Sequence, residues 1–291
     1  MVCIVYLYTE KGGILMKSSA TLSTFLIGSL MLLAAFSPAL ALSSPLMAPG
    51  MCAESTSGSS WYSTNWSGYA VTGPTGSVTS VQGSWTVPAV TGAVRTTAYS
   101  SFWVGIDGFN SGTVEQIGTD SDIQNGRAVY YAWYEFYPKA MVQINTIRIS
   151  VGDVISATVT YLTGSAFTVS ITDTTTGATF STTGTVKNAA RSSAEWIAEA
   201  PSSMRGVLPL ANFGTVNFGQ NTTLVSGTCY ATIGGVTGYI GSFGSAVQTI
   251  TMATSTYNFR THSYTIVPKA VPSPLSDDGT SFSVTWKSAG P

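Results

Sequence analysis

From Trp61 to the end of the chain, short hydrophobic runs alternate with clusters of turn residues. The runs are rich in Val, Ile, Thr, Tyr and Trp, and clusters of Gly, Asn, Asp and Pro separate them. This pattern predicts β-strands joined by tight turns. Clear examples of expected strands are residues 77–87, 101–106, 129–137, 154–161, 167–172, 247–252 and 281–286.

No amphipathic helical pattern longer than about two turns interrupts these runs. Many short strands at near-regular spacing predict an all-β fold, either an antiparallel sandwich or a barrel. Residues 61–291 contain no linker, so we expect one domain. The Pro-rich segment at 268–274 is expected to be an irregular connection before the last strand.

The N-terminal region has a different pattern. A short positive stretch at Met16-Lys17 precedes a continuous apolar run at 25–36, and small residues follow at Ala39 and Ala41. These are the three parts of a secretory signal peptide, which predicts cleavage after Ala41. An uncleaved membrane anchor is the alternative, and the shortness of the apolar run disfavours it.

This interpretation divides the rest of the N-terminal region. Residues 1–15 do not fit ahead of a signal peptide, so we expect translation to start at Met16 and the signal peptide to span 16–41. Residues 42–60, rich in Ser, Pro, Gly and Met without periodicity, are expected to form a flexible arm. The domain would then be 61–291.

Composition excludes several classes of function. The 291 residues carry 12 basic and 13 acidic side chains, a formal net charge of −1, and no cluster of Lys and Arg. A nucleic-acid-binding face is therefore not expected. The single histidine, His262, argues against a His-rich zinc site, and the three cysteines have no C-x-x-C spacing for a thiolate site. We expect no metal and no cofactor.

Export would also change the role of the cysteines. After cleavage Cys52 and Cys229 remain, and an oxidising exterior would permit one disulfide between them, which is a hypothesis. Only 9% of residues are charged, which suits an acidic environment. In acid the carboxyl groups are protonated, and a chain with few Lys and Arg side chains then has few uncompensated positive charges that repel one another. An ordinary secreted β-protein with an uncharged surface is an equal alternative.

One expected strand combines a carboxylate with aromatic residues. Because side chains two apart in a strand share a face, Tyr131, Trp133, Glu135 and Tyr137 line one side of it. A carboxyl group buried among aromatic rings has a raised pKa. The alternative is a half-solvated face with Glu135 exposed.

A second run, at 194–201, places Glu195, Ile197 and Glu199 on one face if it is a strand. An edge strand guarded by charges and a short helix, with the two carboxylates at i, i+4 spacing, are the alternatives. A third segment, at 102–120, holds Asp107 in a turn and Gln116 in a short strand.

Several motifs occur in an order that resembles the glutamic peptidases, or eqolisins. The resemblance covers roughly residues 62–287. Each motif alone is weak, and together in this order they are strong. The motifs are NWSGY at 65–69, GSWTVP at 83–88, WVGIDG at 103–108, QIG at 116–118, AWYEFYP at 132–138, GD at 152–153, AEWIAE at 194–199 and FGTVNF at 213–218.

The resemblance implies two packed antiparallel sheets, lectin-like in architecture, with a concave substrate cleft. It also implies an acid endopeptidase that acts on polypeptides through a Gln–Glu dyad, with Gln116 matching the glutamine and Glu199, rather than Glu195, matching the glutamate. The residues that match cleft positions are Trp66, Asp107, Asp120, Trp133, Glu135 and Tyr137.

The sequence departs from the family pattern in two places. Fungal members carry a long acidic propeptide, whereas only residues 42–60 lie between the predicted cleavage site and the domain. Tyr131 stands where those members have an Asp beside the Trp. The first departure bears on zymogen control, and the second on substrate preference and pH optimum.

Other classes of function compete with this interpretation. A glycoside hydrolase could use two carboxylates, Glu135 and Glu199, and would not need Gln116. A carbohydrate-binding module could stack sugars on the aromatic strand at 131–137. A serine peptidase using His262 lacks a nucleophile motif. We expect a secreted monomer in an acidic environment, bound to no membrane once its signal peptide is removed.

Overall fold

The computed structural model describes residues 54–57, 59–260 and 262–290. The chain divides into two units, Met1–Ser44, which lies outside the described residues, and Pro45–Pro291. The signal peptide, the extension before it and Cys52 also lie outside the described residues and stay predictions. Within the described part, no helix is both long enough and apolar enough to cross a membrane.

Strands make up more than half of the described residues, which also form one short α-helix and one 3₁₀ segment. In chain order the elements are β1 (Glu54–Ser57), β2 (Ser60–Ser63), β3 (Trp66–Thr72), β4 (Val78–Thr86), β5 (Ser101–Ile106), β6 (Val114–Gln124), β7 (Arg127–Tyr137), β8 (Val142–Ile144), β9 (Val154–Thr163), β10 (Ala166–Asp173), β11 (Thr179–Thr185), β12 (Ser193–Glu199), β13 (Ser202–Ser203), β14 (Gly206–Val207), β15 (Thr215–Gly219), α1 (Gln220–Thr223), β16 (Tyr230–Ile233), β17 (Val236–Tyr239), η1 (Ile240–Ala246), β18 (Val247–Asn258), β19 (Ser263–Pro272) and β20 (Ser281–Trp286).

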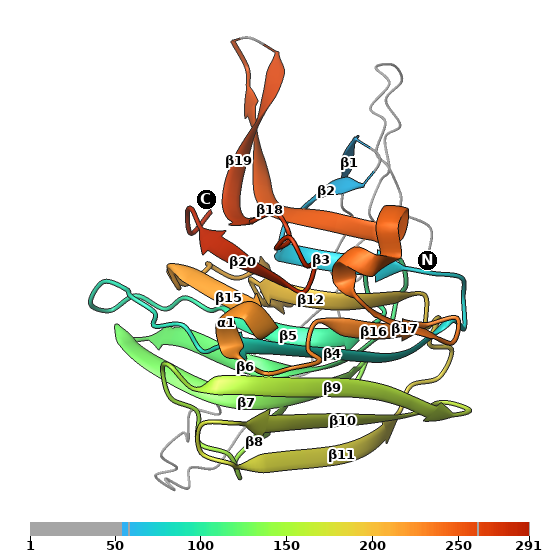
Figure 1. The fold of residues 1–291 in the computed structure, drawn as a ribbon. Coiled ribbons are helices and arrows are strands. Elements are labelled where there is room, and N and C mark those ends of the chain that lie inside the picture. The colour runs from blue at the N-terminus through green and yellow to red at the C-terminus, as the bar shows by residue number, and fades with distance from the viewer. Residues whose placement is uncertain (1–53, 58, 261, 291) are drawn as a thin grey trace, which may run out of the picture. The chain divides into compact units, whose positions relative to one another are not determined.

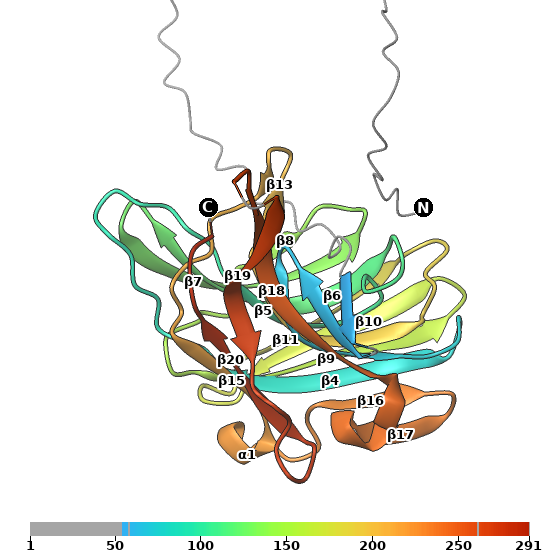
Figure 2. The same ribbon diagram turned by 90° about the horizontal axis from the view of Figure 1, so that it is seen from above.

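Two layers of mainly antiparallel strands make up the domain, which confirms the predicted β-sandwich (Figures 1 and 2). One sheet runs in the order β2-β18-β3-β12-β5-β6-β7-β8, in which β2 lies parallel to β18. The other runs β19-β20-β15-β4-β9-β10-β11, with the β16–β17 hairpin paired to β4. Pairing of β18 with β19 joins the two sheets, and the hairpin they form projects beyond the layers in Figure 1.

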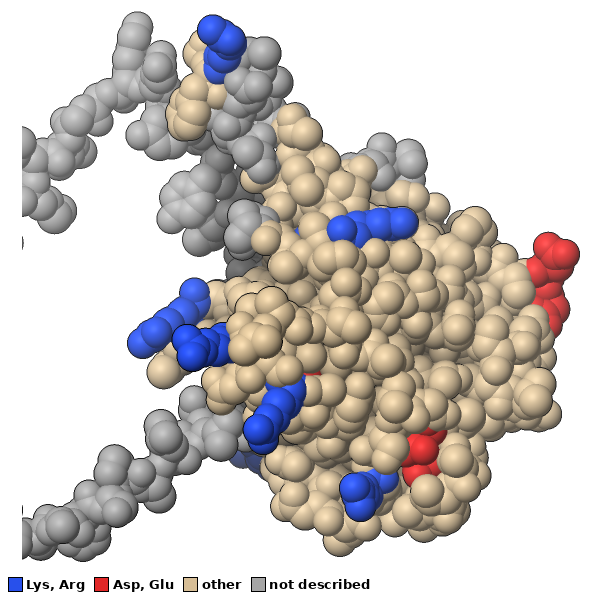
Figure 3. Space-filling view, turned by 90° about the vertical axis from the view of Figure 1, so that its left-hand side faces the viewer, with Lys and Arg blue, Asp and Glu red and all other residues tan. Residues whose placement is uncertain are grey.

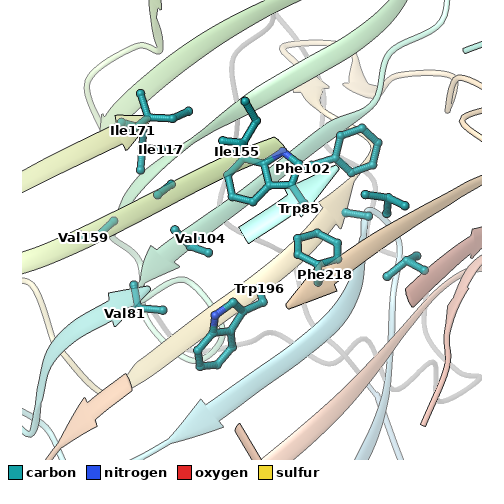
Figure 4. Packing of buried hydrophobic residues seen from close by; sticks show 14 of the residues in the cluster. Val81, Trp85, Phe102, Val104, Ile117, Ile155, Val159, Ile171, Trp196 and Phe218 are labelled. Atoms are coloured by element: carbon teal, nitrogen blue, oxygen red, sulfur yellow. The ribbon is translucent and has the colours of Figure 1, made fainter. Parts of the chain in front are cut away.

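The core lies between the sheets. Trp85, Phe102, Trp196 and Phe218 are fully buried there, among branched side chains from β4, β5, β6, β9 and β10 (Figure 4). Strands β9 and β10 alternate buried and half-buried positions, as expected for strands with one covered face. Burial of this apolar surface, at about 25 cal/mol per Å², is the main force that holds the layers together.

The sheet that contains β5 and β12 is covered on both faces. Every residue of these two strands is buried. On the face away from the core, Trp66, Trp103, Trp133 and Ile197 form a second apolar cluster. Polar side chains that point to this face are therefore removed from bulk water, a position that raises the energy of their charged forms.

The outer face of the other sheet carries neutral hydroxyl groups instead. Across β10 and β11, Thr168 pairs with Thr183 at 3.0 Å and Ser170 with Ser181 at 2.8 Å, oxygen to oxygen. Few side chains are charged on the surface that Figure 3 shows. A surface with few charged groups agrees with the low charged fraction of the sequence.

The structure corrects three local expectations. Residues 54–57 pair as β1 with β2, although the segment up to residue 60 was expected to be a flexible arm. Strand β18 continues six residues past the expected end at 252, and β19 includes Pro268, which was expected to be irregular. Pro268 is tolerated because it lies beside a break in the β18–β19 register, where a donor is not required.

Gly68 provides a test of how closely β3 and β12 approach. Its φ is +145°, and a Cβ atom there would lie 2.1 Å from the carbonyl oxygen of Trp196. We expect Gly68→Ala to destabilise the fold by more than ~1 kcal/mol and to lower the midpoint of thermal unfolding. Gly112→Ala, in open space with an ordinary φ, is the matched control and should melt like the wild type. Equal melting temperatures for the two variants would contradict the packing described here.

Candidate active site

The register of four neighbouring strands, β12, β5, β6 and β7, gathers the polar residues on one face. Glu199 of β12 lies opposite Ser101 of β5, which in turn pairs with Asp120 of β6. Four residues earlier on β6, Gln116 lies opposite Glu135 of β7. Because positions two or four apart share a face, Gln116, Asp120, Glu135 and Glu199 all lie on the covered face that holds the second apolar cluster.

Each carboxyl oxygen of Glu199 accepts a hydrogen bond. Asn65, just before β3, donates from Nδ2 to Oε1 at 3.0 Å, and Trp103 of β5 donates from Nε1 to Oε2 at 2.8 Å. The exposed fraction of Glu199 is 1%, and burial raises its pKa well above the ordinary value. The donated bonds lower the pKa, while the charges of Glu135 and Asp120 raise it. Because each carboxyl oxygen accepts one hydrogen bond, the carboxylate form is favoured, which offsets part of the free-energy cost of burying its charge.

Gln116 is held by Glu135. Its Nε2 donates to Glu135 Oε2 at 2.6 Å, and burial raises the pKa of Glu135 to about 8 although this bond lowers it. One acceptor of each residue, Gln116 Oε1 and Glu135 Oε1, is buried without a hydrogen-bond partner among the described residues. Such atoms are rare in folded proteins and mark a place where a water molecule or a polar group of a substrate would bind. The alternative that Glu135 is exposed is wrong.

Asp120 lies in a separate set of hydrogen bonds on the same face. Ser101 Oγ donates to its Oδ1 at 2.5 Å, and the hydroxyl of Tyr131 lies 2.7 Å from its Oδ2. Burial raises the pKa of Asp120 to about 7, and its hydrogen bonds lower it. Asp120 faces Glu199 across β5, and the two carboxyls influence each other electrostatically.

Aromatic side chains form the walls of the site. Trp66 and Trp103 meet edge to face, with ring centroids 4.9 Å apart, and Trp133 is fully buried beside them. Tyr137 is half-buried and packs against the same cluster. Trp66, Trp133 and Tyr137 thus lie where the sequence places them, on the face that carries Gln116 and Glu199.

Asp107 has a different set of partners. It lies just beyond the end of β5 with φ +73°, and it accepts from the backbone N–H of Arg191 at 2.7 Å and of Ser192 at 2.9 Å. These bonds fix the segment that leads into β12. The described contacts of Asp107 therefore serve the fold, and no contact with Gln116 or Glu199 is among them.

Strand β12 settles the alternatives for residues 194–201. It is a central strand between β3 and β5, so neither an edge strand nor a helix describes it. Glu195 and Glu199 share its outer face, and burial raises the pKa of both carboxyls well above the ordinary value. Among the described residues, no group of three or more His, Cys, Asp or Glu side chains is arranged to hold a metal ion.

Two features were not apparent from the sequence. Asn65 supplies a hydrogen bond to Glu199, and its 2% exposure rules out the glycosylation that an Asn-Trp-Ser sequon would otherwise permit. Glu115 is fully buried, and neither of its carboxyl oxygens has a hydrogen-bond partner in the part of the chain that the structure describes. Only the position of Asn65 beside the cleft residue Trp66 pointed to its role, and no pattern pointed to Glu115. Cys229 is buried, which raises the pKa of its thiol to about 12, and its disulfide with Cys52 stays a prediction because Cys52 lies outside the described residues.

Comparisons with known proteins agree on one family of proteins. The model of the Peptidase A4 family matches residues 64–262. Aspergillopepsin-2 of Aspergillus niger is 34% identical over 188 residues, which are 57% of this chain and 66% of that protein, so the chain spans just under two thirds of that relative's length.

Solved structures show the same fold. Scytalido-glutamic peptidase, crystallised with a transition-state analogue inhibitor, is 26% identical with a TM-score of 0.59, over 77% of this chain and 98% of its own. The aspergilloglutamic peptidase of Aspergillus niger is 29% identical with a TM-score of 0.50, over 65% of this chain and 99% of its own.

Glu115 makes the stability of the domain depend on pH. Burial raises its pKa to about 9, with the charge of Asp107 adding to the effect and Arg191 opposing it. A raised pKa means that the folded form binds the proton more tightly, so stability is highest at low pH and falls between about pH 4.5 and 9. We expect Glu115→Gln to gain roughly 3 kcal/mol over the wild type between pH 4.5 and 7, at 1.36 kcal/mol per pH unit.

Denaturant unfolding at both pH values measures this difference. Asp277→Asn, which removes one charge from an exposed turn, is the matched control and should give the same offset from the wild type at both pH values. A Glu115→Gln curve that runs parallel to the wild type across this range would contradict the assignment.

Proposed function

Because the chain belongs to the Peptidase A4 family of glutamic peptidases, we propose that it is an endopeptidase that hydrolyses peptide bonds with Glu199 and Gln116 as its catalytic pair. The observation that carries this proposal is the placement of both side chains on one covered sheet face, each of them 1% exposed. Glu199 there keeps a hydrogen-bond environment suited to a carboxylate, although burial raises its pKa.

In the proposed reaction Glu199 acts first as a base and then as an acid. Its carboxylate takes a proton from a water molecule as the water oxygen bonds to the scissile carbonyl carbon. The resulting tetrahedral intermediate carries the negative charge on the former carbonyl oxygen. When the C–N bond breaks, the proton passes from Glu199 to the departing nitrogen, and the carboxylate is restored with a carboxylic acid and an amine as products.

Gln116 stabilises the intermediate in this scheme. Its Nε2 donates to the developing oxyanion, and its Oε1, to which no described residue donates, accepts from the water. An amide does not titrate, so this part of the site works at any pH. Glu135 orients the amide through the 2.6 Å bond from Gln116 Nε2, and this bond must weaken or be shared when substrate binds.

We assign the aromatic walls to substrate binding. Trp66, Trp133 and Tyr137 offer flat apolar surfaces beside the reacting groups, which suit the side chains of an extended polypeptide. The low surface charge supports an acidic working environment, and the hydrogen bonds from Asn65 and Trp103 favour the carboxylate form of Glu199 that the reaction needs there. The apolar run at 25–36 supports export, and secretion and the monomeric state remain predictions from the sequence.

The competing interpretations receive less support. A mechanism that uses Glu135 and Glu199 alone would leave no role for the bond between Gln116 and Glu135. His262 lies in an exposed turn between β18 and β19, which is a poor position for a catalytic base.

Substitution of the catalytic pair tests the proposal directly. Glu199→Gln should lower kcat by about 10²–10⁴, because the base is lost, and Gln116→Ala by about 10²–10³, because an oxyanion donor is lost. Turnover of a fluorogenic peptide across pH 2–7 measures both. Matched controls are Asp277→Asn and Gln220→Ala, which lie in an exposed turn and on α1. Full activity of either catalytic variant, with unchanged circular dichroism, would refute the assignment.

The role of Glu135 has its own test. With a pKa near 8, this side chain is a neutral acid at low pH, so an amide can replace it as an acceptor for Gln116. Glu135→Gln should therefore keep most of the activity at acidic pH, while Glu135→Leu should lose about 10²-fold through a misplaced Gln116. Equal activity of the two variants would show that the bond to Gln116 is unimportant.

A further inference from the structure

A tyrosine joins two buried carboxyl groups next to the proposed catalytic pair. Asp120 and Asp122 lie two residues apart on β6, and Tyr131 lies opposite Asp120 on β7. The Tyr131 hydroxyl is 2.7 Å from Asp120 Oδ2 and 3.2 Å from Asp122 Oδ2. Both aspartates are fully buried, so the three groups form a short hydrogen-bonded chain shielded from water.

The single proton of the Tyr131 hydroxyl limits which groups can donate in this hydrogen-bonded chain. A phenol has one proton to donate, and its pKa here is raised far above the ordinary value, so Tyr131 stays protonated. It can donate to only one carboxyl at a time, and the shorter contact marks Asp120 as the acceptor. The contact to Asp122 is then satisfied when Asp122 is the protonated acid and donates to the phenol oxygen.

The surroundings of the two aspartates agree with this order. Asp120 also accepts from Ser101 Oγ at 2.5 Å, whereas Asp122 accepts from the backbone N–H of Ser100 at a longer 3.2 Å. Burial raises the pKa of both aspartates, and the charge of Asp120 adds to the rise at Asp122. Because Asp120 has the shorter hydrogen bonds, from Ser101 and Tyr131, it is the one that carries the charge while Asp122 keeps its proton.

The chain reaches Glu199 through Asp120. Ser101 pairs with Glu199 on one side and with Asp120 on the other, and a charge on Asp120 raises the pKa of Glu199. The other groups that face Glu199 are Glu135, which acts in the same direction, the donors Trp103 and Asn65, and the indole ring of Trp66. Asp122 is faced in addition by the phenol of Tyr99 and the side chain of Gln124.

We propose that Tyr131 and Asp122 are positioning residues that set, through Asp120, the pH at which Glu199 loses its proton. Asp122 serves as a neutral donor to Tyr131, and Tyr131 keeps Asp120 charged over a wider pH range. This role rests on the proposed function of Glu199, and it uses a tyrosine where the sequence departs from the family pattern.

The hydrogen bonds between Asp122, Tyr131 and Asp120 determine the direction in which the pH dependence shifts. Without the Tyr131 hydroxyl, Asp120 loses a donor and holds its proton to higher pH, so it no longer opposes the ionisation of Glu199. The acid limb of kcat/KM, which reports ionisation of the free enzyme, then moves to lower pH. We expect a shift of at least about 0.5 pH unit for Tyr131→Phe. Asp122→Leu, which breaks the chain one step earlier, should move the limb in the same direction.

The conservative variant separates a neutral role for Asp122 from a charged one. An amide can donate to the Tyr131 oxygen as the protonated acid does. Asp122→Asn should therefore have the acid limb of kcat/KM at the same pH as the wild type. Tyr134→Phe, the same substitution on the opposite face of β7, is the matched control and should also leave it unchanged. A limb that moves in Asp122→Asn would overturn the donor role of Asp122.

A second measurement does not depend on turnover. Trp103 donates to Glu199, so its indole ¹H–¹⁵N resonance reports the ionisation of that carboxyl. A titration of this signal in the Gln116→Ala background, with and without Tyr131→Phe, should show the same downward shift. If Glu199→Gln is inactive and neither the limb nor this titration moves in Tyr131→Phe, the role of Tyr131 is overturned while the proposed function stands. If Glu199→Gln remains active, both fail.

Discussion

The site depends on the cross-strand register of one sheet that is covered on both faces. Since side chains alternate along a strand, the pairing of β3, β12, β5, β6 and β7 decides which residues meet on the face away from the core. A slip of one residue in β6 would turn Gln116 and Asp120 into the core and bring Glu115 and Ile117 out. The apolar cluster around Trp103 and Trp133 opposes such a slip, because it would expose or displace fully buried rings.

The same burial gives the site its chemistry. Carboxyl groups removed from water hold their protons more tightly, and each stays buried at a cost that donors offset only in part. Glu199 has two neutral donors, Asp120 has a hydroxyl at each oxygen, and Glu115 has none. The three residues thus range from a carboxylate held ready for reaction to an acid that stays protonated. A fold built this way is most stable in acid.

The sequence predicted the fold class and the strand faces well, because period-two patterns determine both. The alternation around Glu135 and Glu199 placed these residues on their observed face before any partner was known. It did not reveal that Asn65 donates to Glu199 or that Glu115 lies unpartnered in the interior, because both depend on contacts between segments far apart in the chain. It also missed β19 at Pro268, where a local proline signal gave way to pairing with β18.

The most direct test of the account is a crystal structure of the chain with a peptide analogue whose central carbon carries two hydroxyl groups in place of the scissile carbonyl. The account predicts one of these oxygens within hydrogen-bonding distance of Gln116 Nε2 and the other facing the carboxyl of Glu199. An analogue bound with its tetrahedral centre away from both side chains would contradict it.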